Sequence, residues 1–235
     1  MAKENSQRIQ TSILNGLEKK ALVRMAKRQP SWMTSDILTL VGVFGAIVIA
    51  AGYVLSNVNV AFLWLANLGY LINWYGDSLD GTLARVRNTQ RPLYGFYVDH
   101  IVDSINEVFM FVGFGLSVLA DLRLALMVLV VYLQLTVYVS VCAHLKNEFK
   151  LTYGKMGPTE FRLLMIVINL LFMYVPFIRD FRHDFTIFGS PYHATMVDFF
   201  SFAILILLTV MFLVSFFKDA VWFSKADPLK KTDVK

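Results

Sequence analysis

The chain has 235 residues, of which 57% are hydrophobic and 17% are charged, and its mean hydropathy is +0.57. This composition is too apolar for an ordinary soluble domain. The net charge of +5 could suit nucleic-acid binding, but the basic residues flank long apolar segments, so we expect a membrane protein and no nucleic-acid partner. Cys142 is the only cysteine, which excludes an internal disulfide.

Residues 6–28 are expected to form the first helix. Apolar side chains recur there at a spacing of four, among them Ile9, Ile13 and Leu17, while lysine and arginine occupy another side. This pattern is typical of an amphipathic helix lying in the membrane interface against anionic lipid, although a solvated basic helix would show it too. We therefore assign residues 1–36 to a cytoplasmic, interfacial segment.

Six apolar segments follow, and most approach the roughly 20 residues that a helix needs to cross a bilayer. They are Ile37–Leu55, Val58–Gly76, Gly95–Ala120, Leu124–Ala143, Leu163–Ile178 and Phe199–Phe217. We expect them to form an all-α, multi-pass integral membrane domain of six transmembrane helices over residues 37–217. Residues 179–193 would form an outer loop, and residues 218–235 a cytoplasmic tail.

Lysine and arginine are distributed unevenly among the connections of these segments. Residues 1–36 hold seven of the 22, and residues 218–235 hold five. The alternate loops hold only Arg123, Arg179 and Arg182. By the positive-inside rule, both termini therefore face the cytoplasm, together with the connection between the second and third spans.

Four aspartates lie beside or within apolar segments, where an ionised carboxylate is costly and usually marks a functional site. Asp77 and Asp80 are three residues apart. Asp99 and Asp103 are four apart, so on helices each pair lies on one face. Two helices meeting at these faces would offer up to eight carboxylate oxygens, two from each aspartate, which is enough for two Mg²⁺ or Mn²⁺ ions. A buried ion-pair network is the alternative, but only Arg85 stands nearby to neutralise the four charges.

Small residues and an arginine accompany the aspartates. Gly81 follows Asp80, and Gly95 opens the second expected helix, so a ligand backbone or a phosphate could approach closely at both. Ala84 has a small side chain and therefore adds little bulk to the same helical face. Arg85 offers a fixed charge to a phosphate oxygen, although it could equally serve to neutralise the aspartates.

Together these residues resemble the signature of the CDP-alcohol phosphotransferase family, D-x-x-D-G-x-x-A-R followed after a short connection by G-x-x-x-D-x-x-x-D. Every named position of the pattern matches, from Asp77 to Asp103. The connection, residues 86–94, is one residue longer than is usual in the family. The choline and ethanolamine phosphotransferase subgroup is closest in pattern, because it shares the lead into the first span at Pro30 and Trp32.

The resemblance implies a phospholipid-synthesis enzyme that transfers a substituted phosphoryl group from a CDP-linked donor to an alcohol and releases CMP. It also implies a cavity near the cytoplasmic face, a homodimer, and two divalent cations, Mg²⁺ or Mn²⁺, as cofactors. The implied cation ligands are Asp77, Asp80, Asp99 and Asp103. The implied nucleotide and phosphate contacts are Gly81, Ala84, Arg85 and Gly95.

The residue that takes the proton of the attacking hydroxyl is left open among three candidates. Asp103 could take it while sharing a cation. His100 follows Asp99 as in the subgroup and could be a general base, or else a core histidine that donates to a backbone carbonyl. Glu160 resembles a subgroup glutamate, but the helix dipole alone would also favour it in a first turn that Thr159 is expected to cap.

Three further charged residues are weaker candidates. Lys155 and Arg162 could contact a phosphate or the acceptor, although loop lysines are usually solvated. Glu107 lies four residues beyond Asp103 on the same helical face. It could contact the metal ligands without binding the metal itself.

The subgroup resemblance favours transfer of a phospho-headgroup to a lipid hydroxyl of diacylglycerol or ceramide, with membrane lipids as partners. The alternative is a phosphatidyltransferase that uses CDP-diacylglycerol and a soluble acceptor such as inositol, inositol phosphate, glycerol phosphate or serine. An ion-coupled transporter is a remote alternative, because it predicts internal repeats and carboxylates spread over several spans. Here the acids cluster in one signature.

Overall fold

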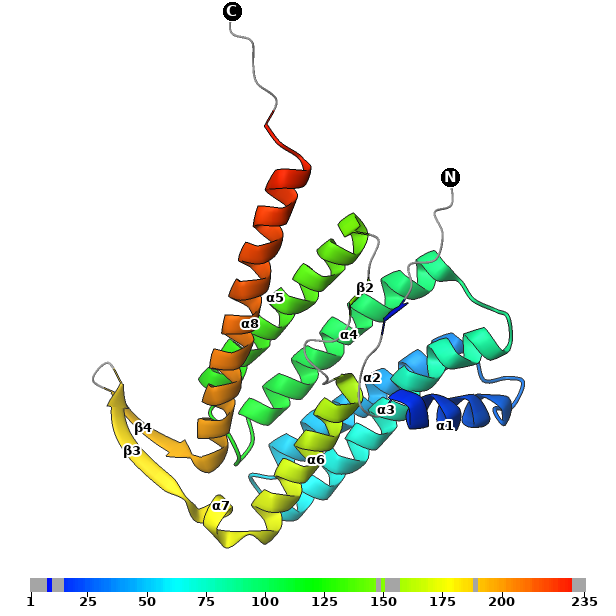
Figure 1. Ribbon diagram of the computed structural model, residues 1–235. Coiled ribbons are helices and arrows are strands. Elements are labelled where there is room, and N and C mark those ends of the chain that lie inside the picture. Colours follow the sequence, from blue (N-terminus) through cyan, green and yellow to red (C-terminus); the bar gives the residue numbers. More distant parts are fainter. Residues whose placement is uncertain (1–7, 10–14, 147–148, 151–156, 188–189, 230–235) are drawn as a thin grey trace, which may run out of the picture.

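The computed structural model describes residues 8–9, 15–146, 149–150, 157–187 and 190–229 (Figure 1). Its helices are α1 Asn15–Lys27, α2 Ser35–Leu55, α3 Leu63–Val86, α4 Pro92–Gly115, α5 Leu122–Lys146, α6 Pro158–Tyr174, α7 Pro176–Asp180 and α8 Met196–Ala226, with a 3₁₀ turn at Val60–Phe62. Its strands are β1 Arg8–Ile9, β2 Phe149–Lys150, β3 Arg182–Ile187 and β4 Ser190–Thr195. The fold is therefore dominated by helices, as the sequence predicts.

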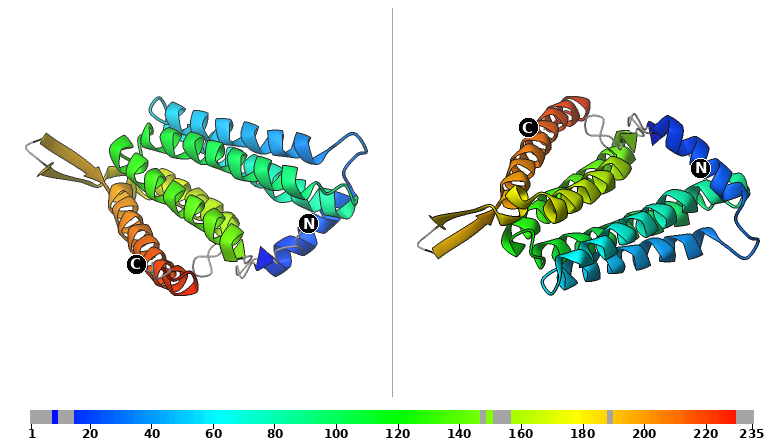
Figure 2. Two further views of the ribbon diagram at one scale, coloured as in Figure 1. Left: turned by 90° about the horizontal axis from the view of Figure 1, so that it is seen from above. Right: turned by 90° about the horizontal axis from the view of Figure 1, so that it is seen from below.

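The long helices after α1 alternate in direction, so their ends gather at two opposite ends of the bundle (Figure 1). Both halves of the aspartate signature lie at the same end, because α3 finishes there and α4 begins there. Figure 2 shows α5 and α8 on the side of the bundle away from α2 and α3, with the β3–β4 hairpin projecting beyond it.

Three helices are long and apolar enough to cross a membrane by length and composition: α2, the Leu122–Cys142 part of α5, and α8. Helices α3 and α4 have 24 residues each, but they carry the signature aspartates. Helix α6 has only 17 residues, because Pro176 lacks the N–H that would continue it beyond Val175. The structure thus confirms an all-α protein with helices that can cross a membrane, while the number of six spans stays a prediction.

Several expected boundaries differ from those of the structure. Arg8 and Ile9 do not belong to the first helix but pair in parallel with Phe149 and Lys150, and α1 begins only at Asn15. The expected outer loop contains the antiparallel β3–β4 hairpin. Helix α8 continues to Ala226, past the expected boundary at residue 217.

Helix α1 packs against α3, the helix that carries Asp77 and Asp80. Its buried Leu22 and Ala26 join a cluster with Leu38 of α2 and with Leu79 and Leu83 of α3. This docking accounts for the apolar stripe of α1 without requiring a lipid contact for every apolar residue. The placement of α1 in the membrane interface stays a prediction.

Glycines allow α2 and α3 to approach at backbone distance. A Cβ added to Gly45 would lie 2.7 Å from the Cα of Asn73, and one added to Gly52 would lie 2.8 Å from the Cα of Ala66. Real Cβ atoms do not come so near to a backbone atom, so a larger residue would force the helices apart. This contact fixes α3, and with it Asp77, against α2.

We predict that Gly45→Ala destabilises the purified protein by about 2 kcal/mol, because the added methyl group has no space beside the α3 backbone. Thermal unfolding in detergent would measure the loss. Gly16→Ala is the matched control, since nothing lies within 4 Å of a Cβ at that position in α1. Equal unfolding temperatures for the two variants would contradict the close α2–α3 contact.

Candidate metal centre

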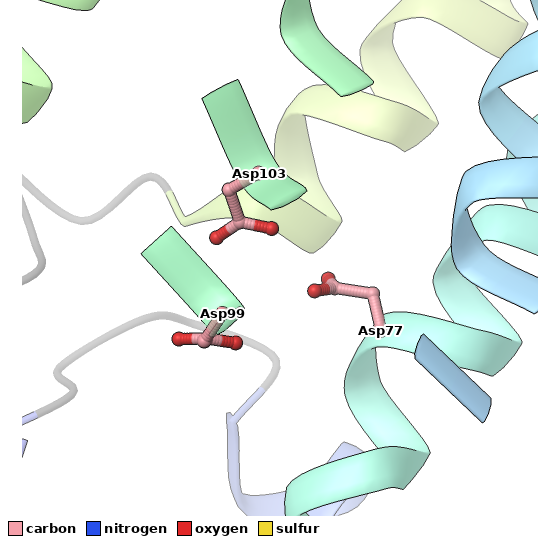
Figure 3. Close-up of side chains that lie close together, drawn as sticks. All are labelled: Asp77, Asp99 and Asp103. Carbon is pink, nitrogen blue, oxygen red and sulfur yellow. The ribbon is translucent and has the colours of Figure 1, made fainter. Parts of the chain in front are cut away.

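Three of the four signature aspartates converge. Asp77 extends from α3, and Asp99 and Asp103 extend from successive turns of α4, so that the three side chains lie close together (Figure 3). Each contributes one carboxylate oxygen to a group whose members all lie within 4.8 Å of one another. Oxygens bound to one Mg²⁺ at about 2.1 Å lie about 3–4 Å apart, so small side-chain rotations would bring the three onto one cation. The residues present therefore fit a divalent cation.

These carboxylates line a small polar cavity between α2, α3 and α4. The residues around it are Thr39, Gly42, Asp77, Asp80, Asp99, Val102, Asp103 and Asn106. Oxygen atoms dominate its polar side, as hard cations such as Mg²⁺ and Mn²⁺ prefer. The cavity unites both halves of the signature, as the sequence predicts.

Asp80 lines the cavity, but its carboxylate is held differently from the other three. Its Oδ2 atom accepts a hydrogen bond of 2.7 Å from the hydroxyl of Thr39 on α2, and its Oδ1 atom accepts one from the Gly81 N–H. Asp80 is therefore not one of the three converging residues in this structure. Its role as a cation ligand remains a prediction, and it would require either a rotation or a second cation nearer to α2.

Arg162 of α6 pairs with the converging aspartates, which sequence analysis did not anticipate. Its Nη2 atom donates to Asp77 Oδ2 at 2.6 Å, and its Nε atom donates to Asn73 Oδ1 at 2.8 Å. Asn73 is fully buried, and its Nδ2 atom donates in turn to the Gly42 carbonyl at 2.9 Å. A polar chain from α2 through α3 to α6 thus fixes the orientation of Asp77.

The sequence predicts a phosphate or acceptor contact for Arg162 and offers Arg85 as the arginine that could neutralise the aspartates. In the structure Arg162, on another helix, pairs with Asp77, so a second arginine shares that charge, and the role of Arg85 stays a prediction. The sequence does indicate that Arg162 has a charged partner, since a charged residue in an apolar helix usually pairs with another charge in the bundle. The sequence alone does not reveal which charge it pairs with.

The expected nucleotide contacts lie on α3 and at the start of α4. Gly81 and Ala84 are half-buried, and Arg85 is exposed, with Nη2 donating to the hydroxyl of Thr82 at 3.0 Å. Gly95 is exposed, and nothing of the described chain lies within 4 Å of a Cβ placed on it. The start of α4 at Gly95 is therefore open, whereas Gly81 lies against the Arg85 guanidinium, and the nucleotide role of these four residues remains a prediction.

His100 lies beside the carboxylates on the first turns of α4. Its Nδ1 atom is 2.9 Å from the carbonyl of Phe96 and 3.8 Å from Asp99 Oδ2, and its ring lies against the Phe96 ring with centroids 4.1 Å apart. When Nδ1 carries the proton and donates to that carbonyl, Nε2 is an acceptor. The geometry therefore accommodates both the structural role and the role of a base.

The start of α6 differs in detail from the expectation. Gly157 is the N-cap, and the Glu160 carboxylate accepts from its N–H at 2.9 Å. Thr159 is consequently not the cap; its hydroxyl instead donates at 2.7 Å to Glu18 of α1, which also accepts from Trp74 Nε1 at 2.7 Å. Pro158 at the first helical position moves the cap to Gly157, since proline favours that position. Lys155 lies outside the described residues.

We predict that Arg162→Met lowers the free energy of unfolding of the metal-free protein by about 3 kcal/mol, because it leaves the largely buried Asp77 without its partner. Saturating Mg²⁺ should restore more stability to this variant than to the wild type, since a cation replaces the lost charge. Arg123→Met is the control, because its ion pair with Asp121 is exposed and should contribute little. Similar losses in both variants would contradict the importance of the Arg162 pair.

Comparison with known proteins identifies the family of this chain. The family model described as CDP-alcohol phosphatidyltransferase matches residues 32–214. Cholinephosphotransferase 1 of Homo sapiens is 30% identical over 150 residues, and that of Bos taurus is 27% identical over the same length. In each case the match covers 60% of this chain and 36% of the relative, so the chain spans about a third of the length of the curated relatives. The resemblance to the family and to its choline and ethanolamine phosphotransferase subgroup is thereby confirmed, and the chain belongs to the CDP-alcohol phosphatidyltransferase family.

Proposed function

We propose that this chain is a membrane-embedded phosphotransferase that moves a substituted phosphoryl group from a CDP-linked donor to an alcohol and releases CMP. The convergence of Asp77, Asp99 and Asp103 in one cavity is the observation that carries the proposal. Carboxylates this close repel one another, so a site that keeps them together is suited to divalent cations. The family match supports the reaction type.

When bound, two divalent cations would supply the positive charge that stabilises the leaving phosphate. Asp77, Asp99 and Asp103 would hold them, and Asp80 would contribute from the α2 side of the same cavity. Arg162 would keep Asp77 oriented, so that little reorganisation is needed during turnover. Preorganised charge of this kind is the main contribution that a protein can make to phosphoryl transfer.

Gly81, Ala84, Arg85 and Gly95 would surround the cytidine diphosphate. The two glycines lack side chains where a phosphate or ribose must come close, and Arg85 can donate to a phosphate oxygen. Their position at the exposed ends of α3 and α4 supports this role, because a soluble nucleotide must reach them from water.

The base remains a choice among Asp103, His100 and Glu160. Asp103 lines the cavity, His100 follows the cavity residue Asp99 and has Nδ1 near the Phe96 carbonyl, and Glu160 accepts from the Gly157 N–H. Neutral replacement of the true base should lower turnover by about a hundredfold or more. Comparable turnover after such a replacement would remove that residue from the role.

A lipid hydroxyl is the proposed acceptor. Similarity to cholinephosphotransferases supports it, as does an apolar cavity between α3, α4, α5, α6 and α8. Its walls include Met110, Phe111, Phe114, Val128, Phe161 and Met165.

We further propose that α2, α3, α4, α5, α6 and α8 all cross the membrane, with both termini on the cytoplasmic side. Two observations support this topology: the alternating directions of the helices, and the basic residues around the end of the bundle where α3 finishes and α4 begins. The carboxylates of α3 and α4 would then face the cavity rather than lipid, which is how membrane helices accommodate charge. The homodimer expected from the family resemblance belongs to the same proposal.

A donor screen tests the proposed reaction. The purified chain in lipid nanodiscs, supplied with Mn²⁺ or Mg²⁺, should release CMP from CDP-choline, CDP-ethanolamine or CDP-inositol only when diacylglycerol or ceramide is present. Asp103→Asn, folded but lacking one carboxylate of the cavity, should release none above background.

CMP release from CDP-diacylglycerol with a soluble alcohol, and from no other donor, would contradict the lipid acceptor and establish phosphatidyl transfer instead. Failure of every donor with a folded protein and bound cation would contradict the enzymatic proposal as a whole.

A further inference from the structure

Asn106 is a buried polar residue of the metal cavity that the family signature does not include. It lies on α4, its side chain is only 4% exposed, and it forms part of the cavity wall. Its amide oxygen, Oδ1, accepts no hydrogen bond from any residue that the structure describes. An unsatisfied buried acceptor costs about 1–3 kcal/mol, so its presence here needs an explanation.

The position of Asn106 on α4 continues the line of metal-site aspartates. Asp99, Asp103 and Asn106 follow one another at intervals of four and three residues, which places them on one face of the helix. All three line the cavity, and Gly42 and Asp77 form the opposite wall. Asn106 is therefore one turn farther from the cytoplasmic end of α4 than Asp103.

The hydroxyl of Thr39 on the cavity wall, and the nearby donors of Asn73 and Arg162, are engaged with other acceptors. The hydroxyl of Thr39 donates to Asp80, and the amide of Asn73 donates to the Gly42 carbonyl. Arg162 donates to Asn73 and Asp77. The partner of Asn106 Oδ1 is consequently expected to be a species that enters the cavity.

We propose that Asn106 Oδ1 is an additional oxygen ligand of the divalent-cation site, at its inner end. The inference rests on the proposed function, because it assumes that the cavity holds Mg²⁺ or Mn²⁺. An amide oxygen is a suitable ligand for such hard cations and adds no negative charge to a cavity that already holds several carboxylates. The unsatisfied oxygen of the metal-free protein thereby gains its partner when the cation binds.

Two substitutions separate a ligand from a packing residue. Asn106→Leu removes the oxygen at nearly constant size, so Mn²⁺ affinity should fall at least about tenfold. Metal-free unfolding should then occur at the same temperature as in wild type or above it, because the variant removes an unsatisfied group. Asn106→Asp restores an oxygen ligand and should bind Mn²⁺ at least as tightly as wild type. Val102→Ala, on the same wall without a polar atom, should leave the affinity unchanged.

The measurement is a Mn²⁺ titration of the full chain in nanodiscs, followed by electron paramagnetic resonance, with thermal unfolding in parallel. Equal Mn²⁺ affinity for wild type and Asn106→Leu would overturn this inference and leave the proposed function standing. Equally weak binding by Asn106→Leu and Asn106→Asp, with lowered metal-free stability in both, would also overturn it by assigning a packing role. Absence of Mn²⁺ binding by wild type would overturn the proposed function together with the inference.

Discussion

Mutual repulsion of carboxylates in a cavity between the helices is the constraint on which the rest of the structure depends. Asp77, Asp99 and Asp103 bring oxygens within 4.8 Å of one another, in surroundings where charge is expensive. Arg162 balances part of that charge by pairing with Asp77. The arrangement is consistent with a site shaped for cations rather than with a network that stabilises the fold by itself, because buried ion pairs contribute little net stability.

The bundle supplies the rigidity that such a site requires. Glycines at 42, 45 and 76 bring the α2 and α3 backbones together, so that α3 has little freedom to move Asp77 away from α4. Asn73 links the Gly42 carbonyl to Arg162 and hence joins α6 to the same framework. Residues outside the signature therefore position the residues within it.

The parts of the site that depend on local spacing could be predicted from the sequence. Helical intervals placed Asp77 and Asp80 on one wall of the cavity, and the two halves of the signature came together as expected. The pairing of Arg162 with Asp77 could not be predicted, because that contact joins residues 85 apart and depends on how α3 and α6 pack. A role for Asn106 could not be predicted from the sequence, because a neutral amide in an apolar helix does not stand out as a buried charge does. Its role is indicated only by its burial and by its unsatisfied oxygen in the structure.

Secondary structure was recovered with similar limits. The long apolar helices follow from composition, whereas the β3–β4 hairpin lies in a polar segment whose pairing depends on cross-strand contacts rather than on a strong alternating pattern. The cap of α6 was misassigned by two residues, because the preference of proline for the first helical position outweighed that of Thr159 for the cap. Such errors shift boundaries but leave the signature helices in place.

The most direct test of the account is a structure of the protein with Mn²⁺, in which anomalous scattering locates the metal. The account predicts a manganese peak between α3 and α4, with oxygens of Asp77, Asp99 and Asp103 within about 2.2 Å of a metal ion. A folded protein at saturating Mn²⁺ that shows no peak in the cavity, with its carboxylates still apart, would contradict the central claim.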